Sequence, residues 1–272
     1  MDQPKLHASS QFGEADWLKP RLRHFGAGVA ALVPDGFPAY IRILHPAGGR
    51  NGQHIRWAEV ARESGAAMHR LVQFHRLQQR LAEPSMIGNP PETGNLPPEL
   101  LMALYPALAE HTDTADACYF CLWHGYGFLY DGGISSLTFT PIGIDEPPEA
   151  TRAAAGGWQP LSAALRAAAR APSRVQLPQR EYLLFEGPLE AAGELGWFMP
   201  GGHFVAQSPN LFWPRDHAWC VASEIDLPCT FVAGSNRLVE TLLAQPHLEA
   251  WRVFADDPVT ADSGDCGTPP NE

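Results

Sequence analysis

The sequence predicts an α+β fold, a mostly antiparallel sheet with helices packed on one face. Three observations support this prediction. Short apolar runs bounded by Gly and Pro recur at residues 28–45, 117–124, 181–185 and 203–233, as expected of strands joined by turns. Hairpin-type connections favour an antiparallel sheet over a parallel one. Between the runs, apolar residues at helical spacing predict amphipathic helices that cover the sheet.

The first half of the chain contains both predicted strands and predicted helices. Residues 28–33 and 38–45 are apolar runs on either side of Pro34-Asp35-Gly36, a turn signal, and we expect them to form a hairpin. The remaining predicted elements of this half are helices at residues 55–61, 65–81 and 96–111 and a strand at residues 117–124.

The second half centres on residues 207–235, which read as three strands separated by turns. From Ala218 to Asp226 the side chains alternate, which puts Glu224 and Asp226 on the same predicted strand face. Ser235 then caps a predicted helix at residues 236–244. The other predicted elements are a helix at residues 161–170, a strand at 181–185 and a short helix at 188–195.

Composition divides the chain into four segments. Residues 1–130 form an N-terminal α+β half, and residues 181–255 form a C-terminal α+β half. Residues 131–180 are rich in Pro, Gly and Ala and predict a crossover between the halves. Residues 256–272 are small, acidic and rich in Pro and Gly, and we expect a disordered tail. A single composite domain and two halves that meet at the crossover both remain open.

Length and composition predict a folded cytoplasmic protein. The 272 residues are 45% hydrophobic and 10% aromatic, enough for a sizeable core. No apolar run approaches the roughly 18 residues of a membrane-spanning helix, and the first residues lack a signal-peptide pattern. Because neither pattern is present, we expect no contact with a membrane.

The abundance of Ala, Gly, Pro and Arg is typical of a GC-rich bacterial genome.

Charge is distributed unevenly along the chain. The net charge is −11, but residues 1–80 carry 11 Lys and Arg against 6 Asp and Glu, whereas residues 81–272 carry 8 against 24. An acidic chain without a basic stripe is a poor nucleic-acid binder, because phosphate neutralisation provides most of that affinity. The basic N-terminal part pairs either with the acidic remainder of the chain or with an acidic partner.

The carboxylates Glu224 and Asp226 are the first candidate for catalysis. Together with Arg215 and His217 across a turn, they are of the residue types that form an acid/base cluster. When two carboxyl groups share a site shielded from water, the pKa of one is raised, and the pair can then transfer protons. The alternative is the solvated face of an edge strand, with Arg215 as a weak surface partner.

Cys118-x-x-Cys121, followed by His124, resembles the spacing of zinc ligands or of a redox pair. On a strand, however, the two cysteines point to opposite faces, which disfavours joint binding of a metal. The alternative is an apolar strand that uses Cys as a small hydrophobic residue. We expect neither a metal nor another cofactor.

Large aromatic residues next to predicted strand ends are candidates for binding. Trp123, Tyr126, Trp213 and Trp219 are the four that we expect to line a recognition cleft, because such residues dominate binding interfaces. The alternative is a core of large side chains beneath stiff loops.

Several motifs resemble those of an uncharacterised bacterial protein family. They are Phe120-x-x-Trp123-x-Gly125-Tyr126, Tyr182-Leu-Leu-Phe-x-Gly-Pro188 and Ser208-Pro-Asn-Leu-Phe-Trp-Pro214, within a similarity that covers most of residues 12–262. The strand and helix at residues 230–243 are also similar to those that end the α+β domain of the SUKH immunity superfamily. This second resemblance implies an immunity-type inhibitor and gives no residue a role.

The sequence thus favours a cytoplasmic, non-catalytic protein that binds a protein partner, in one form an immunity-type inhibitor. The alternative is a hydrolase or transferase that uses the carboxylate pair Glu224 and Asp226.

Overall fold

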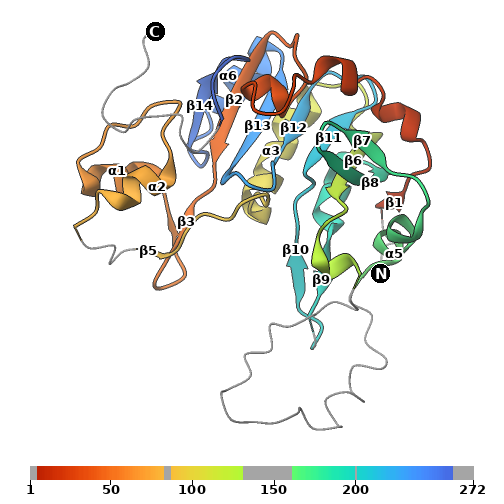
Figure 1. Ribbon diagram of the computed structural model, residues 1–272, viewed down its shortest axis with the longest axis horizontal. Helices are drawn as coiled ribbons and strands as arrows, with labels where there is room; N and C mark the ends of the chain where they lie inside the picture. Colours follow the sequence, from red (N-terminus) through yellow and green to blue (C-terminus); the bar gives the residue numbers. More distant parts are fainter. Residues whose placement is uncertain (1–4, 83–86, 131–160, 200, 260–272) are drawn as a thin grey trace.

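The computed structural model describes residues 5–82, 87–130, 161–199 and 201–259. Its centre is an antiparallel sheet with the strand order β1-β8-β6-β11-β12-β13-β2-β14, in which β7 also pairs with β8 (Figure 1). These strands are β1 (His7–Ala8), β2 (Ala39–Leu44), β6 (Cys118–Trp123), β7 (Val175–Leu177), β8 (Arg180–Gly187), β11 (Leu211–Pro214), β12 (Cys220–Ala222), β13 (Cys229–Gly234) and β14 (Ala250–Val253). The predicted α+β class is confirmed.

Strands from the two halves of the chain alternate within this sheet. Strand β2 lies between β13 and β14, and β6 lies between β8 and β11. Residues 1–130 and 181–255 therefore contribute to one sheet. Two smaller sheets flank it, made of β3 (Ala47–Gly49), β4 (His54–Ile55) and β5 (Ile87–Asn89), and of β9 (Gly196–Phe198) and β10 (Phe204–Ala206).

Each face of the central sheet has its own hydrophobic core, because side chains alternate along the strands. On β2, Ile41 and Ile43 face the core that also contains the buried sides of three helices, α3 (Pro98–Glu110), α5 (Ala163–Arg170) and α6 (Asn236–Leu243). Tyr40 and Leu44 face the opposite core. Short helices contribute to that core, namely η1 (Phe12–Ala15), η3 (Val29–Ala31), α1 (Trp57–Ser64) and α2 (Phe74–Gln79).

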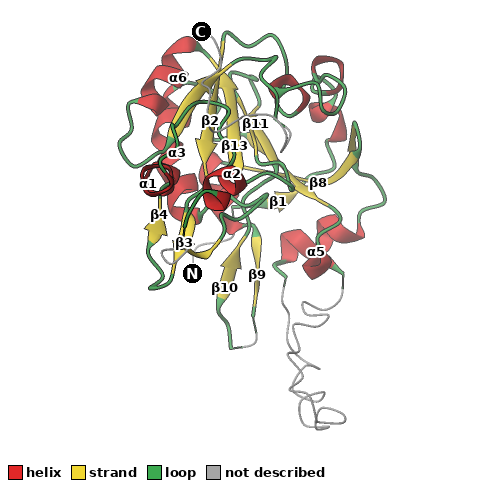
Figure 2. Cartoon of the chain, turned by 60° about the vertical axis from the view of Figure 1, so that its left-hand side comes forward, coloured by secondary structure: helices red, strands yellow, loops and turns green. Residues whose placement is uncertain are grey.

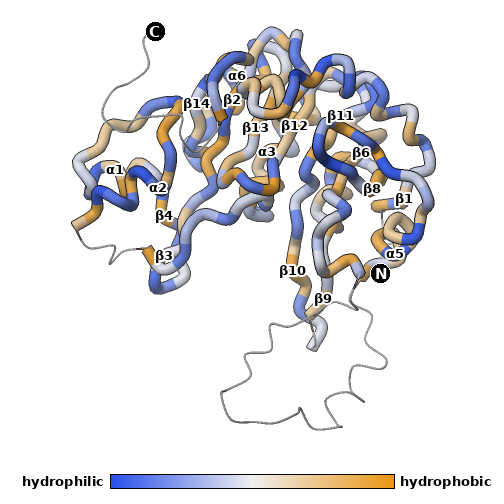
Figure 3. The backbone as a smooth tube through the Cα atoms, in the orientation of Figure 1, coloured by the Kyte–Doolittle hydropathy of each residue, from blue (hydrophilic) through white to orange (hydrophobic). Residues whose placement is uncertain are grey.

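Helices α1 and α2 each bury one side. Along α1 and α2, hydrophobic and hydrophilic residues alternate in short stretches, as expected of helices with one buried side (Figure 3). None of the described helices is long and apolar enough to cross a membrane.

The predicted hairpin at residues 28–45 is wrong in its first strand. Residues 29–31 form the 3-10 helix η3, and β2 pairs with β13 and β14 instead. Val29 and Ala30 donate their backbone N–H groups to the carbonyls of Asp257 and Ala255. Gly28 permits this approach, because its φ is +92° and an added Cβ would lie 2.9 Å from both carbonyl oxygens.

The predicted helix at residues 65–81 forms only in part, as α2 (Phe74–Gln79). The preceding segment is held by Arg42, whose Nη1 donates to the carbonyls of Arg70 and Val72 at 3.0 and 2.9 Å. A helix would use the Arg70 and Val72 carbonyls internally, so this long-range contact favours a turn over local propensity.

The predicted disordered tail at residues 256–272 is ordered over residues 256–259. Asp257 is buried and accepts a hydrogen bond from Arg70 Nε at 2.9 Å. Residues 260–272 lie outside the described residues, as do residues 131–160 of the predicted crossover.

Other predicted elements are confirmed with shifted ends. The helices predicted at residues 96–111, 161–170 and 236–244 are α3, α5 and α6, and the helix predicted at 188–195 is the 3-10 helix η5 (Leu189–Glu194). Ser235 caps α6, since its Oγ accepts the Leu238 backbone N–H at 3.1 Å. The strand predicted across residues 218–226 is shorter, because β12 ends at Ala222.

Candidate functional site

Glu224 and Asp226 lie in the turn between β12 and β13, and a single arginine joins them. Arg180, at the start of β8, donates from Nε and Nη2 to Glu224 Oε1 at 3.1 and 2.7 Å. The same Nη2 donates to Asp226 Oδ2 at 2.9 Å. The Glu224 side chain is 9% exposed and that of Asp226 is 71% exposed. The two carboxylates are therefore bound to one cation.

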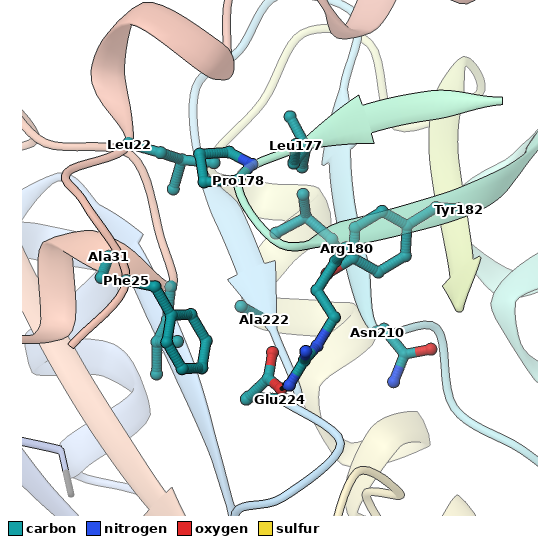
Figure 4. Close-up of a pocket in the computed structure, with 12 residues that line it drawn as sticks. Leu22, Phe25, Ala31, Leu177, Pro178, Arg180, Tyr182, Asn210, Ala222 and Glu224 are labelled. Atoms are coloured by element: carbon teal, nitrogen blue, oxygen red, sulfur yellow. Dashed lines mark hydrogen bonds and ion pairs between the residues drawn. The ribbon is translucent and has the colours of Figure 1, made fainter. Parts of the chain in front are cut away.

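The space beside this ion pair is small. Figure 4 shows the Arg180 guanidinium directed at the Glu224 carboxylate, with Phe25, Tyr182 and Asn210 around them. The hollow has a volume of about 30 Å³, room for about one or two water molecules. The Arg180 guanidinium lies 5.3 Å from the centre of the Phe25 ring. The Phe25 ring and the Arg180–Glu224 ion pair thus leave little room for a substrate beside the carboxylates.

Arg180 remains charged in this environment. Burial alone would lower the pKa of Arg180, but the hydrogen bond and charge of Glu224, with the charge of Asp226, outweigh burial and raise it. The cluster consequently has no proton that it can exchange near neutral pH at the arginine. Its chemistry is that of a structural ion pair.

Arg215 and His217 lie at the other end of β11 from the carboxylates. Leu211 pairs with Ala222, so Glu224 lies near the start of β11, whereas Arg215 follows its end. The four residues of β11 lie between the two positions, which places them more than about 13 Å apart. The four predicted catalytic residues are not brought together.

His217 belongs to an aromatic contact instead. Its ring stacks on Trp17, with ring centres 4.2 Å apart and an interplanar angle of 15°. Burial lowers the pKa of His217, which favours the neutral ring. Neighbouring Asp216 accepts hydrogen bonds from the Thr112 hydroxyl and the Asp113 backbone N–H, both at 2.8 Å. These contacts fix the β11–β12 turn.

A buried polar chain lies between β2, β12 and β13. His45 Nδ1 is 2.7 Å from the Glu92 carbonyl, which can only accept, so Nδ1 carries the proton. Nε2 then accepts from the Thr230 hydroxyl at 2.8 Å, and Thr230 Oγ1 is 2.7 Å from Ser223 Oγ. All three side chains are at most 2% exposed. Ser223 is therefore closed to a substrate, and the chain's role is to satisfy buried polar groups.

Cys118 and Cys121 point to opposite faces of the sheet, as predicted. Cys118 belongs to the core with α3 and α6, and Cys121 belongs to the other core. Burial raises the pKa of the Cys118 thiol to about 12, so it stays protonated near neutral pH. Within the described part of the chain, no three His, Cys, Asp or Glu side chains are arranged to hold a metal ion.

The four aromatic binding candidates divide into two pairs. Trp213 and Trp219 are 0% exposed, and Trp219 Nε1 donates to the Leu108 carbonyl at 2.9 Å. They fill the cores, so neither can line an exposed cleft. Trp123 and Tyr126 are partly exposed and form an edge contact with ring centres 5.3 Å apart.

A row of aromatic rings continues from this pair to a hairpin. Tyr126 stacks on Phe128, which stacks on Trp197 of β9 with ring centres 4.4 Å apart. The Tyr126 hydroxyl accepts from Asn210 Nδ2 at 2.9 Å, and burial raises the pKa of Tyr126 to about 12. The base of the β9–β10 hairpin is thus fixed to the body of the protein.

Beyond Trp197, this hairpin exposes apolar side chains that no sequence pattern indicates. Phe198 is 37% exposed and Met199 is 42% exposed. Phe204 pairs with Phe198 across the hairpin, with ring centres 5.1 Å apart. The hairpin extends away from the central sheet (Figures 1 and 2). We call Phe198, Met199 and Phe204 the hairpin surface.

Gly196 is necessary for this hairpin geometry. Its φ is +148°, and an added Cβ would lie 2.2 Å from the Val205 carbonyl oxygen and 2.7 Å from the Phe204 ring. The Phe204 ring therefore occupies space that only a glycine leaves free.

A hollow of about 420 Å³ lies next to the hairpin surface. Most of its lining is apolar, and its lining residues are Leu6, Ser162, Ala163, Ala164, Gly193, Glu194, Phe198 and Phe204. This volume is in the range of pockets that hold small ligands or single side chains.

The chain matches none of the protein-family models, curated proteins or solved structures with which it was compared.

Proposed function

We propose that this chain is a non-catalytic protein of the bacterial cytoplasm that binds a protein partner through the hairpin surface. The observation that carries the proposal is the exposure of Phe198 at an apolar hollow of about 420 Å³, with exposed Met199 next to it in the chain. Exposed apolar groups that adjoin a pocket are typical of interaction sites. The stacked rings from Tyr126 to Trp197 hold the hairpin in place, which lowers the entropy cost of binding.

The catalytic alternative, a hydrolase or transferase using Glu224 and Asp226, has less support. Arg180 binds both carboxylates, and the adjacent hollow of about 30 Å³ admits only water-sized groups. Arg215 and His217 lie at the far end of β11. A substrate would have to break the ion pair before it could reach a carboxylate.

An immunity-type inhibitor is one form of this proposal. Such a protein needs a rigid surface that covers a partner's site, and it needs no catalytic groups of its own. The excess of acidic residues in positions 81–272 favours a basic partner. The resemblance to the SUKH superfamily supports the same class of function.

The test is affinity capture from a lysate of the source cells with matched variants. Phe198→Ser with Met199→Ser removes the apolar groups of the hairpin surface. Met102→Ser with Phe254→Ser is the control, because these side chains are 57% and 58% exposed elsewhere on the protein. The proposal predicts a partner protein that the wild type and the control retain and the hairpin variant loses. Equal capture by all three forms, or no specific capture, would contradict it.

A further inference from the structure

Glu194 gives the apolar hollow beside the hairpin a single acidic group. It ends η5, and its carboxylate accepts the backbone N–H groups of Lys5 and Leu6 at 3.0–3.1 Å. These bonds fix the carboxylate in place, but both donors are uncharged backbone groups. Among the described residues, none of the ion pairs includes Glu194.

The described charged residues that contact Glu194 or share its 3-10 helix do not neutralise it. Glu190 is exposed on the same 3-10 helix and adds a second negative charge. Lys5 contacts Glu194, but the contact is made by its backbone N–H and not by its ammonium group. A carboxylate at the edge of an apolar hollow attracts a cation more strongly than one in open water, because less solvent screens the interaction.

We propose that the hollow binds an apolar group that carries a cationic nitrogen, with the nitrogen paired to Glu194. Phe198, Phe204 and Leu6 provide the apolar contact, and the aromatic rings also favour a nearby cation. In the proposed protein partner, the group is an apolar side chain next to a lysine or arginine. The net charge of −11 also favours a basic partner. This inference rests on the proposed function and specifies the chemistry of the partner.

Small probes test this chemistry without the partner. Octylammonium, octanol and octanoate share one alkyl chain and differ in the charge of the head group. Binding is measured by titration, with ¹⁵N chemical shifts of the Gly193 and Phe204 amides as the readout. We expect octylammonium to bind roughly fivefold tighter than octanol, the ratio for a partly exposed ion pair, and octanoate to bind most weakly.

Two variants separate the contributions of charge and apolar contact. Glu194→Gln keeps a side-chain oxygen that accepts the backbone N–H groups of Lys5 and Leu6. It should reduce the ratio of the affinities for octylammonium and octanol to about one. Phe198→Ser should lower the affinity for all three probes by a similar factor. Phe254→Ser should leave all three affinities unchanged. Equal binding of octylammonium and octanol by the wild type would overturn the role of Glu194. Absence of any shift at Gly193 and Phe204 would overturn the hollow as a binding site.

These results are independent of the affinity capture. Loss of a captured partner on changing Phe198 and Met199 supports the proposed function even if the probes show no preference for a cation. Conversely, a cation preference without any captured partner leaves a small-ligand site and removes the protein partner from the account.

Discussion

Arg180 is the cation that compensates the buried carboxylate of Glu224 in the β12–β13 turn. Its side chain is 17% exposed and that of Glu224 is 9% exposed, so water screens their contact little. Without the guanidinium, Glu224 would be a buried carboxylate with no cation beside it. Breaking such a pair from one side costs more free energy than the pair itself contributes.

Arg180→Met should therefore lower the free energy of unfolding by about 3 kcal/mol. Arg237→Met is the matched control, because the Arg237–Glu110 pair is 78% and 58% exposed, and its loss should cost less than about 1 kcal/mol. Urea unfolding of both variants measures the difference. Similar small losses in the two would show that Glu224 is already accessible to water, and would revive it as a catalytic candidate.

His45 makes stability depend on pH. Burial lowers the pKa of His45 to about 4 in the folded protein, whereas an unfolded histidine titrates near about 6.5. Above pH 6.5 both states are neutral and the stability is fully present. As pH falls from about 6.5 to 4, the unfolded chain binds a proton that the folded protein excludes. Stability should fall by about 1.4 kcal/mol per pH unit over this range.

His45→Gln should reduce this dependence while keeping a donor for Glu92 and an acceptor for Thr230. Urea unfolding at pH 7, 6 and 5 is the measurement, and the comparison of variant with wild type cancels the other titrating groups. We expect the wild type to lose about 2 kcal/mol more than the variant between pH 7 and 5. Parallel curves would mean that His45 is protonated in the folded state.

At the scale of elements, α6 depends on its capping serine. Ser235 Oγ accepts the Leu238 N–H, and Leu238, Val239 and Leu242 are buried against the sheet. Ser235→Ala should lower the free energy of unfolding by about 1 kcal/mol. Ser173→Ala, in the exposed connection before β7, should change it by less than about 0.5 kcal/mol. Thermal or urea unfolding that fails to separate the two would contradict the cap's contribution.

Elements set by local patterns could be predicted from the sequence. Helices α3 and α6 and strands β6 and β13 have regular apolar spacing with clear ends. Residues 29–31 could not be predicted, because contacts with the carbonyls of Ala255 and Asp257 replace the expected strand pairing. The turn before α2 likewise depends on Arg42, from 28 residues earlier in the chain. Such contacts leave no signal in the local sequence.

The candidate site was predictable to a similar extent. Glu224 and Asp226 were paired by their spacing, but their partner Arg180 is 44 residues from Glu224, and only the strand order brings it near. Trp123 and Tyr126 were found as aromatic residues at a strand end. Phe198 and Met199 were missed, because their exposure follows from how the hairpin is held by Phe128 and Trp197.

At the scale of the whole molecule, the strand order predicts a single cooperative unit. Strand β2 of the first half lies between β13 and β14 of the second, and β6 lies between β8 and β11. Neither half can leave the sheet without breaking the pairing of the other. Urea unfolding followed by tryptophan fluorescence and by far-ultraviolet circular dichroism should give coincident transitions. Two separated transitions would indicate that the halves unfold independently.

The distribution of exposed apolar side chains favours the hairpin surface as the place where a partner binds. Of the large exposed apolar side chains among the described residues, Phe198 lines a hollow of ligand size, and Met199 follows it in the chain. Met102 and Phe254 lie on different elements, α3 and the segment after β14. A contiguous apolar area beside a pocket provides more buried surface than scattered side chains do.

The most direct test of the proposed function is photo-crosslinking in the source cells. A benzophenone amino acid is placed at position 198 in one version and at position 254 in another, since both phenylalanines are exposed. We expect a discrete crosslinked protein at position 198 that is absent at position 254. We also expect this product to decrease when Met199→Ser is added. The same products at both positions, or no product at position 198, would contradict binding through the hairpin surface.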